Sequence, residues 1–416
     1  MQTTQATQST QNVQNVRNTQ MYVLALNPTD SVTEGFLPAA QRLGLRTTLL
    51  TDQPGAHRDR HPDLEILECD VRDHHAVITR ISTHRPPGAV FSNSDHLQAQ
   101  TALAAAYFGL PAKDWRAALR TKDKAEMRRH LAAHGPGDDA VRSVELAPGL
   151  DAPALAALDV PYPCVLKPRE GVASEDVVRA GGPAELIRHY ERVRARRPGA
   201  VLVAEEFLPG ELHTLETLGD GRRLHVLGGF RTELSPPPYF IEERLTYEPA
   251  LPAPVVAQVL ERLAELGVGF GACHTEFVLC EGRARIVEVN YRAIGDQCDL
   301  LLAELLGIPL FEHILRTHLG EPLPADLRAR RDGAARLDYP CADRAGTLTA
   351  APGPADLASG DVRLTYRPVR SVGERHELYH TNRDFLGVVR ATGRDRESVD
   401  RAVNGFLAGQ SWEITP

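Results

Sequence analysis

The stretch GACHTEFVLCEGRARIVEVNYR, residues 271–292, alternates between apolar and polar residues on both sides of Glu281-Gly282. Because successive side chains of a strand point to opposite faces, this pattern predicts two antiparallel strands joined by a tight turn. The mostly apolar face carries Cys273, Thr275, Phe277, Leu279, Val287, Val289 and Tyr291. The opposite face carries His274, Glu276, Val278, Ile286, Glu288, Asn290 and Arg292. The hairpin therefore presents a row of polar side chains above a buried core.

A three-residue turn centred on Gly282 places Glu276 directly opposite Glu288 and His274 opposite Asn290. Two carboxylates about 5 Å apart repel each other, and a cation between them removes the repulsion. Carboxylate and amide oxygens suit Mg²⁺, which binds through one or two carboxylates completed by water and substrate phosphates. A slip of one residue would bury the polar row, so the apolar face favours this register. The alternative is an ordinary exposed strand face.

The chain contains four lysines, Lys113, Lys122, Lys124 and Lys167, beside forty-three arginines. A lysine ammonium is a compact point charge that reaches phosphate oxygens, whereas arginine suits planar recognition of a phosphate or carboxylate. With Arg292 at the end of the polar row, the set predicts phosphoryl chemistry in which Lys124 and Lys167 contact phosphates. We expect Lys113 and Lys122 to lie on the surface, because neither belongs to a partner motif.

The length of 416 residues predicts roughly two to four domains. A net charge of -8 argues against nucleic acid or an anionic membrane as a partner. The six cysteines lack CxxC spacing, which is typical of buried thiols in a reducing compartment. Without a long apolar run or a signal-peptide pattern, we expect a cytoplasmic protein. Residues 1–20, rich in Gln, Thr and Asn, predict a disordered tail.

From residue 21, short apolar runs alternate with helical periods, including helices near 34–43 and 73–83. This alternation predicts a parallel sheet covered by helices, and the missing GxGxxG turn makes an ordinary dehydrogenase improbable. Further predictions are a helix over 121–135 with Thr121 as N-cap, a mobile connection over 135–150, a helix over 183–197, a hairpin at 219–221, and a helix over 255–266 that ends at Gly267.

The order of these motifs resembles the ATP-grasp superfamily over roughly residues 21–410. The resemblance implies an α/β chain, α+β in its central domains, with the ATP-grasp fold between a Rossmann-like pre-ATP-grasp domain and a small α+β closing domain. The expected boundaries are a tail at 1–20, the pre-ATP-grasp domain at 21–115, the small ATP-grasp subdomain at 116–204, the catalytic subdomain at 205–325 and the closing domain at 326–416.

The same resemblance implies the site. ATP phosphates would bind Lys124, Lys167 and Ser174, with Glu205, Glu206, Phe207 and Leu208 at the adenine and Glu211 at the ribose. Glu276, Glu288 and Asn290 match Mg²⁺ ligands, for which Mn²⁺ is a substitute, and Arg292 matches the arginine that steadies an acyl phosphate. Substrate contacts would come from His274, Gly295 and Asp296, although a lone strand histidine is more often structural.

Within the superfamily the chain is most similar to amino-acid ligases that make dipeptides and to enzymes of siderophore and peptide-antibiotic biosynthesis. YFIEERLTYEPALP, GVGFGACHTEF and FLGVVRATGRDRESVDRAVNGFLAG carry this similarity. Biotin-dependent carboxylases share the plan, but no biotinyl-lysine motif follows. Three departures stand out. The loop REGVASEDV is poor in glycine, Tyr291 replaces a common proline, and Asp296 replaces a small residue. An acidic Asp296 suits an ammonium substrate, and an N-cap for a helix over 297–306 is its alternative.

The leading hypothesis is an ATP-dependent ligase that joins a small-molecule carboxylate to an amine through an acyl phosphate and releases ADP and phosphate. A ligase of the same fold that makes an ester, or uses a hydroxy-acid such as citrate, is one alternative. A nucleotide-binding regulatory protein without turnover is another, of a different class. The partners expected are small molecules, with a homodimer left open.

Overall fold

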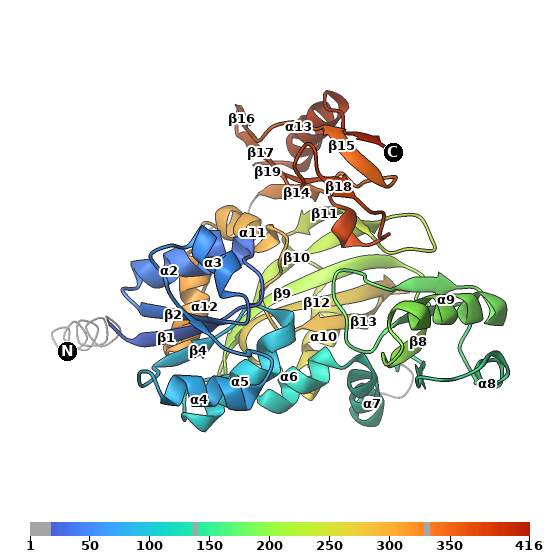
Figure 1. Ribbon diagram of the computed structural model, residues 1–416. Helices are drawn as coiled ribbons and strands as arrows, with labels where there is room; N and C mark the ends of the chain where they lie inside the picture. The colour runs from blue at the N-terminus through green and yellow to red at the C-terminus, as the bar shows by residue number, and fades with distance from the viewer. Residues whose placement is uncertain (1–17, 136–139, 328–332) are drawn as a thin grey trace.

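The structure is a computed structural model that describes residues 18–135, 140–327 and 333–416 (Figure 1). Most of the predicted tail therefore lies outside the described residues. The end of the predicted tail is already ordered, because Gln20 is the first residue of strand β1 and is 7% exposed. Within the described ranges, no helix combines the length and apolarity that a bilayer crossing requires.

The N-terminal part is a four-stranded parallel sheet in the order β3-β2-β1-β4, as the alternating pattern predicts. Its strands are β1 (Gln20–Leu24), β2 (Arg46–Thr51), β3 (Glu65–Glu68) and β4 (Ala89–Phe91). The helical segments between and after them are η1 (Ser31–Phe36), α2 (Leu37–Arg42), α3 (Pro54–Arg60), α4 (His74–Ser82), η2 (Asp95–Leu97) and α5 (Gln98–Tyr107). The loops at the carboxyl ends of β1 and β4 face the centre of the molecule, where ligands of open parallel sheets bind.

The single helix predicted over 121–135 is two helices, α6 (Trp115–Lys122) and α7 (Lys124–His134). Asp123 separates them with an extended backbone, and its side chain accepts a hydrogen bond from the backbone N–H of Glu126. Asp123 is therefore the N-cap of α7, and the prediction of Thr121 in that role is wrong. The Thr121 hydroxyl donates to the carbonyl oxygen of Ala117, a full turn back inside α6.

A second four-stranded sheet has the order β5-β8-β6-β7, with neighbours antiparallel. It contains β5 (Ser143–Leu146), β6 (Cys164–Pro168), β7 (Val178–Ala180) and β8 (Leu202–Glu206), with α8 (Ala152–Ala156) and α9 (Pro183–Arg196) beside it. Strand β5 falls inside the predicted mobile connection, so that prediction is wrong for residues 143–146. Residues 136–139 of the connection lie outside the described residues.

A nine-stranded sheet runs through the centre in the order β13-β12-β9-β10-β11-β14-β19-β17-β16. The five central strands are β9 (Glu211–Asp220), β10 (Leu224–Leu234), β11 (Glu242–Glu248), β12 (Phe270–Cys280) and β13 (Arg283–Asn290). The pairing of β11 with β14 (Ala334–Asp338) attaches the C-terminal strands β16 (Ala355–Ser359), β17 (Val362–Pro368) and β19 (Gly387–Gly393) to them. The C-terminal part thus extends the same sheet, as the red strands at the top of Figure 1 show.

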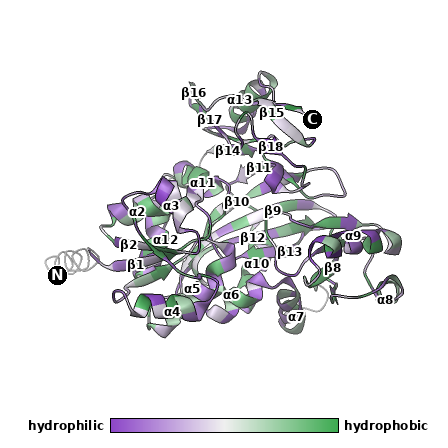
Figure 2. Cartoon of the chain, viewed as in Figure 1, coloured by the Kyte–Doolittle hydropathy of each residue, from purple (hydrophilic) through white to green (hydrophobic). Residues whose placement is uncertain are grey.

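The remaining C-terminal elements form a smaller layer on this extension. Strands β15 (Gly346–Ala350), β18 (Arg375–His376) and β20 (Glu413–Thr415) make a three-stranded sheet, and η4 (Asn382–Asp384) and α13 (Arg396–Ala408) complete the layer. In Figure 2 both the strands of the central sheet and the outer helices α4 and α9 mix hydrophilic and hydrophobic residues. Such mixing is expected of elements that bury one face and leave the other polar.

Helix α10 (Ala253–Leu266) covers one face of the central strands and ends at Gly267, whose φ of 84° is the left-handed conformation of a helix C-cap. Both features confirm the prediction. Its apolar stripe packs on the face of β12 and β13 that carries Phe277 and Val289. The helices α11 (Cys298–Leu306) and α12 (Leu310–His318) join the apolar cluster that connects the N-terminal sheet to β11. The polar face of β12 and β13 is thereby left to line a cavity.

Tyr291, which departs from the family pattern, follows β13 and is 1% exposed. Its phenolic oxygen accepts hydrogen bonds from the backbone N–H groups of Gly269 and Phe270, at 3.2 and 3.1 Å. The residue therefore ties the end of β13 to the start of β12.

Replacing Tyr291 by phenylalanine leaves two partly buried N–H groups without this acceptor, so the free energy of unfolding should fall by about 1–3 kcal/mol. Urea unfolding followed by circular dichroism measures the change. Tyr107→Phe is the matched control, because Tyr107 is 66% exposed, and its effect should stay within about 0.5 kcal/mol. Equal stability of Tyr291→Phe and the unmodified protein would contradict the role given to this hydroxyl.

Candidate active site

A cavity of about 1060 Å³ lies between the N-terminal loops, the β5–β8 sheet, the central strands and the C-terminal layer. Every residue that the sequence predicted for the site lines it. These residues are Lys124, Lys167, Ser174, Glu205, Glu206, Phe207, Leu208, Glu211, His274, Glu276, Glu288, Asn290, Arg292, Gly295 and Asp296. They come from segments up to 172 residues apart, from Lys124 to Asp296, so the fold alone brings them together.

The register of β12 and β13 places Glu276 opposite Glu288 and His274 opposite Asn290, as predicted. The turn that produces this register differs from the prediction. Glu281 and Gly282 both have positive φ, 51° and 78°, and form a two-residue turn with Cys280 paired to Arg283. The register then shifts by one residue between Glu276 and Phe277, and this irregularity restores the predicted pairing at the glutamates.

The irregularity also changes which side chains share a face. Phe277 pairs with Ile286, and Ile286 joins the apolar cluster with Val289. Val287 and Glu288 both line the cavity. The prediction that alternation would place Val287 on the apolar face and Ile286 on the polar face is therefore wrong, because the extra residue breaks the period of two.

Arg128 of α7 holds this irregular segment, and the sequence reasoning did not identify it. Its guanidinium donates to the carbonyl oxygens of Ile286 and Val287, at 2.6 and 3.0 Å. The same group donates twice to the carboxylate of Glu205, at 2.9 and 2.7 Å. Arg128 is 6% exposed, so one buried side chain connects α7, β8 and β13.

Cations already contact the facing carboxylates. The Lys124 ammonium lies 2.8 Å from Glu288 Oε1, and the Asn290 amide donates to Glu276 Oε1 at 3.5 Å. Burial alone would raise the pKa of Glu276, but a hydrogen bond and the charge of His274 lower it. For Lys124, burial opposes the charge and hydrogen bond of Glu288, whose combined effect raises its pKa. The charged form of Glu276 is therefore stabilised.

The oxygen atoms of these side chains fit a hard cation whose coordination the protein completes only in part. Glu276, Glu288 and Asn290 line the same wall and offer oxygens once the Asn290 amide turns. Among the described residues, no group of three His, Cys, Asp or Glu side chains is arranged as a complete metal site. A cation here would need water or phosphate oxygens to complete its coordination, which is the usual situation of Mg²⁺.

The second predicted lysine is paired with a carboxylate as well. Lys167 Nζ lies 2.7 Å from Glu205 Oε2, and both side chains are almost fully buried. Burial alone would raise the pKa of Glu205, but the charges and hydrogen bonds of Arg128 and Lys167 lower it to about 2. The Glu205 side chain thus faces two cations. Nearby, the backbone N–H groups of Glu206 and Phe207 donate to Arg142 and Pro163.

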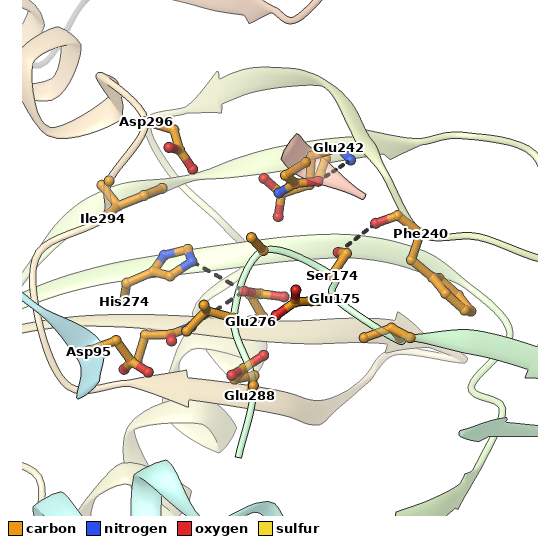
Figure 3. Close-up of a pocket in the computed structure, with 18 of the residues that line it drawn as sticks. Asp95, Ser174, Glu175, Phe240, Glu242, His274, Glu276, Glu288, Ile294 and Asp296 are labelled. Atoms are coloured by element: carbon orange, nitrogen blue, oxygen red, sulfur yellow. Dashed lines mark hydrogen bonds and ion pairs between the residues drawn. The ribbon is translucent and has the colours of Figure 1, made fainter. Parts of the chain in front are cut away.

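The glycine-poor loop after Lys167 adopts left-handed backbone at Ala173, Ser174 and Asp176, with φ of 56°, 55° and 59°. Side-chain and backbone contacts hold it in place. The Ser174 hydroxyl donates to the carbonyl oxygen of Phe240 at 2.7 Å, as Figure 3 shows. The Ala173 carbonyl accepts from the backbone of Asn382 at 3.2 Å, and Glu175 pairs with Arg383. The loop is therefore fastened to β11 and the C-terminal layer.

The far end of the cavity carries the predicted substrate residues. Arg292 donates to the carbonyl oxygen of Ala293 at 3.0 Å, and Asp296 is exposed to the cavity with a φ of 52°. Helix α11 begins at Cys298 with Gln297 as N-cap and without a side-chain capping bond, so the N-cap alternative for Asp296 is wrong. Glu242, which the sequence reasoning missed, lies across from Asp296 in Figure 3. Burial and the charges of Glu276 and Asp296 raise its pKa to about 8.

The other two lysines are not surface residues, contrary to the prediction. Lys113 is 7% exposed and donates to Gln98 Oε1 at 2.6 Å and to the carbonyl oxygen of Tyr291. Lys122 forms an ion pair with Asp95, the first residue of η2. These contacts link α6 and the loop before it to segments beside the cavity. The partners do not form a sequence motif with either lysine, so the sequence did not indicate the contacts.

Comparisons with known proteins identify the fold. No protein-family model matches the chain. A protein of Sinorhizobium fredii called uncharacterized protein y4rH is 26% identical over 414 residues, which cover 95% of this chain and 83% of that protein. L-amino acid ligase from Bacillus licheniformis superposes with a TM-score of 0.79 at 20% identity, covering 96% of this chain and 100% of that one.

Two other solved structures share the architecture at lower identity. Biotin carboxylase from Campylobacter jejuni has a TM-score of 0.67 at 15% identity, covering 94% of this chain and 92% of that one. N5-carboxyaminoimidazole synthetase from Staphylococcus aureus, in complex with ADP, has a TM-score of 0.66 at 14% identity, covering 94% and 97%. These likenesses show that the chain has the ATP-grasp fold, a mixed α/β architecture of one parallel sheet and several antiparallel pairings.

The buried carboxylate of Glu205 predicts a pH dependence of stability. Its pKa is about 2 in the folded protein, against an ordinary 4.5. The unfolded chain therefore binds a proton first as the pH falls, so the stabilisation is complete above about pH 5 and declines towards pH 2. Urea unfolding at steps from pH 5 to pH 3 should show the stability difference between the unmodified protein and Glu205→Gln shrinking by roughly 2 kcal/mol. A constant difference would contradict this account.

Proposed function

We propose that this protein is an ATP-dependent carboxylate–amine ligase that forms an amide through an acyl phosphate. One observation carries the proposal. The facing pair Glu276 and Glu288 shares a cavity wall with Asn290, and Lys124 contacts the pair directly. Oxygen donors for a hard cation and a lysine for phosphate oxygens thus meet in a fold shared with solved ligases.

In this proposal ATP occupies the cavity beside the β5–β8 sheet. Lys124 and Lys167 exchange their carboxylate partners for phosphate oxygens, and Ser174 contacts the phosphates after releasing Phe240. The segment Glu205, Glu206, Phe207 and Leu208 borders the adenine, and Glu211 binds the ribose. Glu276, Glu288 and Asn290 hold Mg²⁺, or Mn²⁺ in its place, which supplies charge neutralisation between the phosphates when bound.

The chemical role of the protein is then mainly positioning and charge stabilisation. A carboxylate oxygen of the substrate attacks the γ-phosphorus, the bond to the β–γ bridging oxygen breaks, and ADP leaves. Arg292 steadies the resulting acyl phosphate. The amine nitrogen attacks the acyl carbon, inorganic phosphate departs, and the amine loses a proton. Asp296 and Gly295 border this end of the cavity together with His274, where an ammonium group can approach the acidic side chains.

We further propose a role in making dipeptides, siderophores or related secondary metabolites, because YFIEERLTYEPALP and GVGFGACHTEF resemble segments of such ligases. The proposed units, residues 21–115, 116–204, 205–325 and 326–416, follow the order of the sheets along the chain. The last two units share the nine-stranded sheet through β11 and β14. The proposal also includes that two copies of this protein form a homodimer and that its substrates are small molecules.

Glu288→Gln tests the proposal, because it removes one charge from the cation site while keeping the side-chain shape. ADP release, measured with Mg²⁺ and a panel of carboxylic acids and amines, should fall below detection, and mass spectrometry should find no ligated product. Glu281→Gln, in the exposed turn of the same hairpin, should retain activity.

Circular dichroism and the unfolding temperature of Glu288→Gln should match those of the unmodified protein. Full turnover by this variant would overturn the metal assignment. Tight ATP binding by the unmodified protein without phosphate release across the whole panel would instead favour a non-catalytic nucleotide-binding role.

A further inference from the structure

A second carboxylate lies behind the proposed cation site. Glu216 is on β9, directly opposite His274 of β12, and is 3% exposed. As the cross-strand partner of His274 it points to the same face of the sheet, where it lies beside His274, and it does not line the cavity. The proposed phosphoryl chemistry gives Glu216 no task, so its burial beside a histidine needs another explanation.

The contacts form a row that leads from Glu216 to the cation site. The Thr214 hydroxyl donates to Glu216 Oε1 at 2.8 Å, and His274 Nδ1 lies 2.8 Å from the same oxygen. On its other side, His274 Nε2 lies 3.4 Å from Glu276 Oε1. Figure 3 shows the imidazole directed at Glu276. The histidine thus stands between a hidden carboxylate and one that faces the cavity.

Both ring nitrogens of His274 face carboxylate oxygens, at 2.8 Å for Glu216 and 3.4 Å for Glu276. The contact to Glu216 is the shorter one, so Glu216 sets the orientation of the ring that lies beside Glu276.

We infer that Glu216 is a positioning residue that acts through His274 to keep Glu276 oriented and available for the divalent cation. The inference rests on the proposed function, since it assumes that Glu276 is a metal ligand. With Glu216 in place, the ring is held 3.4 Å from Glu276 Oε1 and supports the orientation of that carboxylate through a long contact. Without the charge of Glu216, Glu276 is the carboxylate left within reach of the ring, which can then move onto the oxygen that the cation needs.

Glu216→Gln removes that charge with little change of shape. The probe is the Mg²⁺ concentration that half-saturates binding of a non-hydrolysable ATP analogue, measured by isothermal titration calorimetry on the full chain. Substitutions behind a metal ligand commonly weaken metal binding about 10- to 100-fold, and we expect an increase in half-saturating Mg²⁺ of that size. Binding of the nucleotide without Mg²⁺ should stay unchanged.

The double variant Glu216→Gln with His274→Gln separates positioning from a general structural role. If the released ring moves onto Glu276, removing the ring should recover most of the lost Mg²⁺ affinity. Additive or greater loss in the double variant would overturn the inference. Glu248→Gln is the matched control, because Glu248 pairs with His213 Nδ1 at 3.0 Å on strands of the same sheet, and neither residue lines the cavity. Its Mg²⁺ dependence should equal that of the unmodified protein.

The result also separates this inference from the proposed function. Mg²⁺-dependent binding by the unmodified protein with an unchanged Mg²⁺ requirement in Glu216→Gln contradicts the role of Glu216 alone. Absence of Mg²⁺-dependent binding in the unmodified protein contradicts the proposed function itself. Should Glu216→Gln fail to fold, Glu216→Asp carries the test, because it keeps the buried charge but shortens the reach to His274. An unchanged Mg²⁺ requirement there would equally contradict the inference.

Discussion

Two like charges face each other across β12 and β13, and much of the surrounding structure compensates for that arrangement. Glu276 and Glu288 are opposed in the register of the hairpin, which by itself destabilises a strand pair. Lys124 contacts one carboxylate and His274 the other. The protein therefore places a nitrogen-bearing side chain of its own against each glutamate, and a bound divalent cation would take over part of that role.

The register that opposes the glutamates depends on a side chain from another element. The two-residue turn alone would offset the pair by one position, and the irregularity at Val287 restores it. Arg128 donates to the carbonyl groups on both sides of that point and to Glu205, which in turn pairs with Lys167. The proposed cation site and the second predicted lysine thus share one buried network, which connects the two sheets that enclose the cavity.

The sequence predicted the elements whose pattern is local. Helix α10 with its Gly267 cap and the parallel N-terminal sheet follow from periodicity and turn residues. The opposition of Glu276 and Glu288 was also predicted, but the turn and the irregularity that together produce it were not. Interactions between distant segments left no such pattern. Glu216 lies 58 residues before His274, and Arg128 is one arginine among many on a helix. Lys113 binds a carbonyl oxygen 178 residues away, so its burial could not be foreseen. The roles of the predicted site residues remain proposals, which rest on the fact that these residues line one cavity.

The most direct measurement is the anomalous X-ray scattering of Mn²⁺ in crystals of the protein grown with a non-hydrolysable ATP analogue. The account predicts a Mn²⁺ peak at about 2.0–2.3 Å from carboxylate oxygens of both Glu276 and Glu288, as for other hard divalent cations. It also predicts phosphate oxygens in the same coordination shell and Lys124 turned from Glu288 towards the phosphates. A nucleotide in the cavity with no metal between these carboxylates, or a metal bound at other residues, would contradict it.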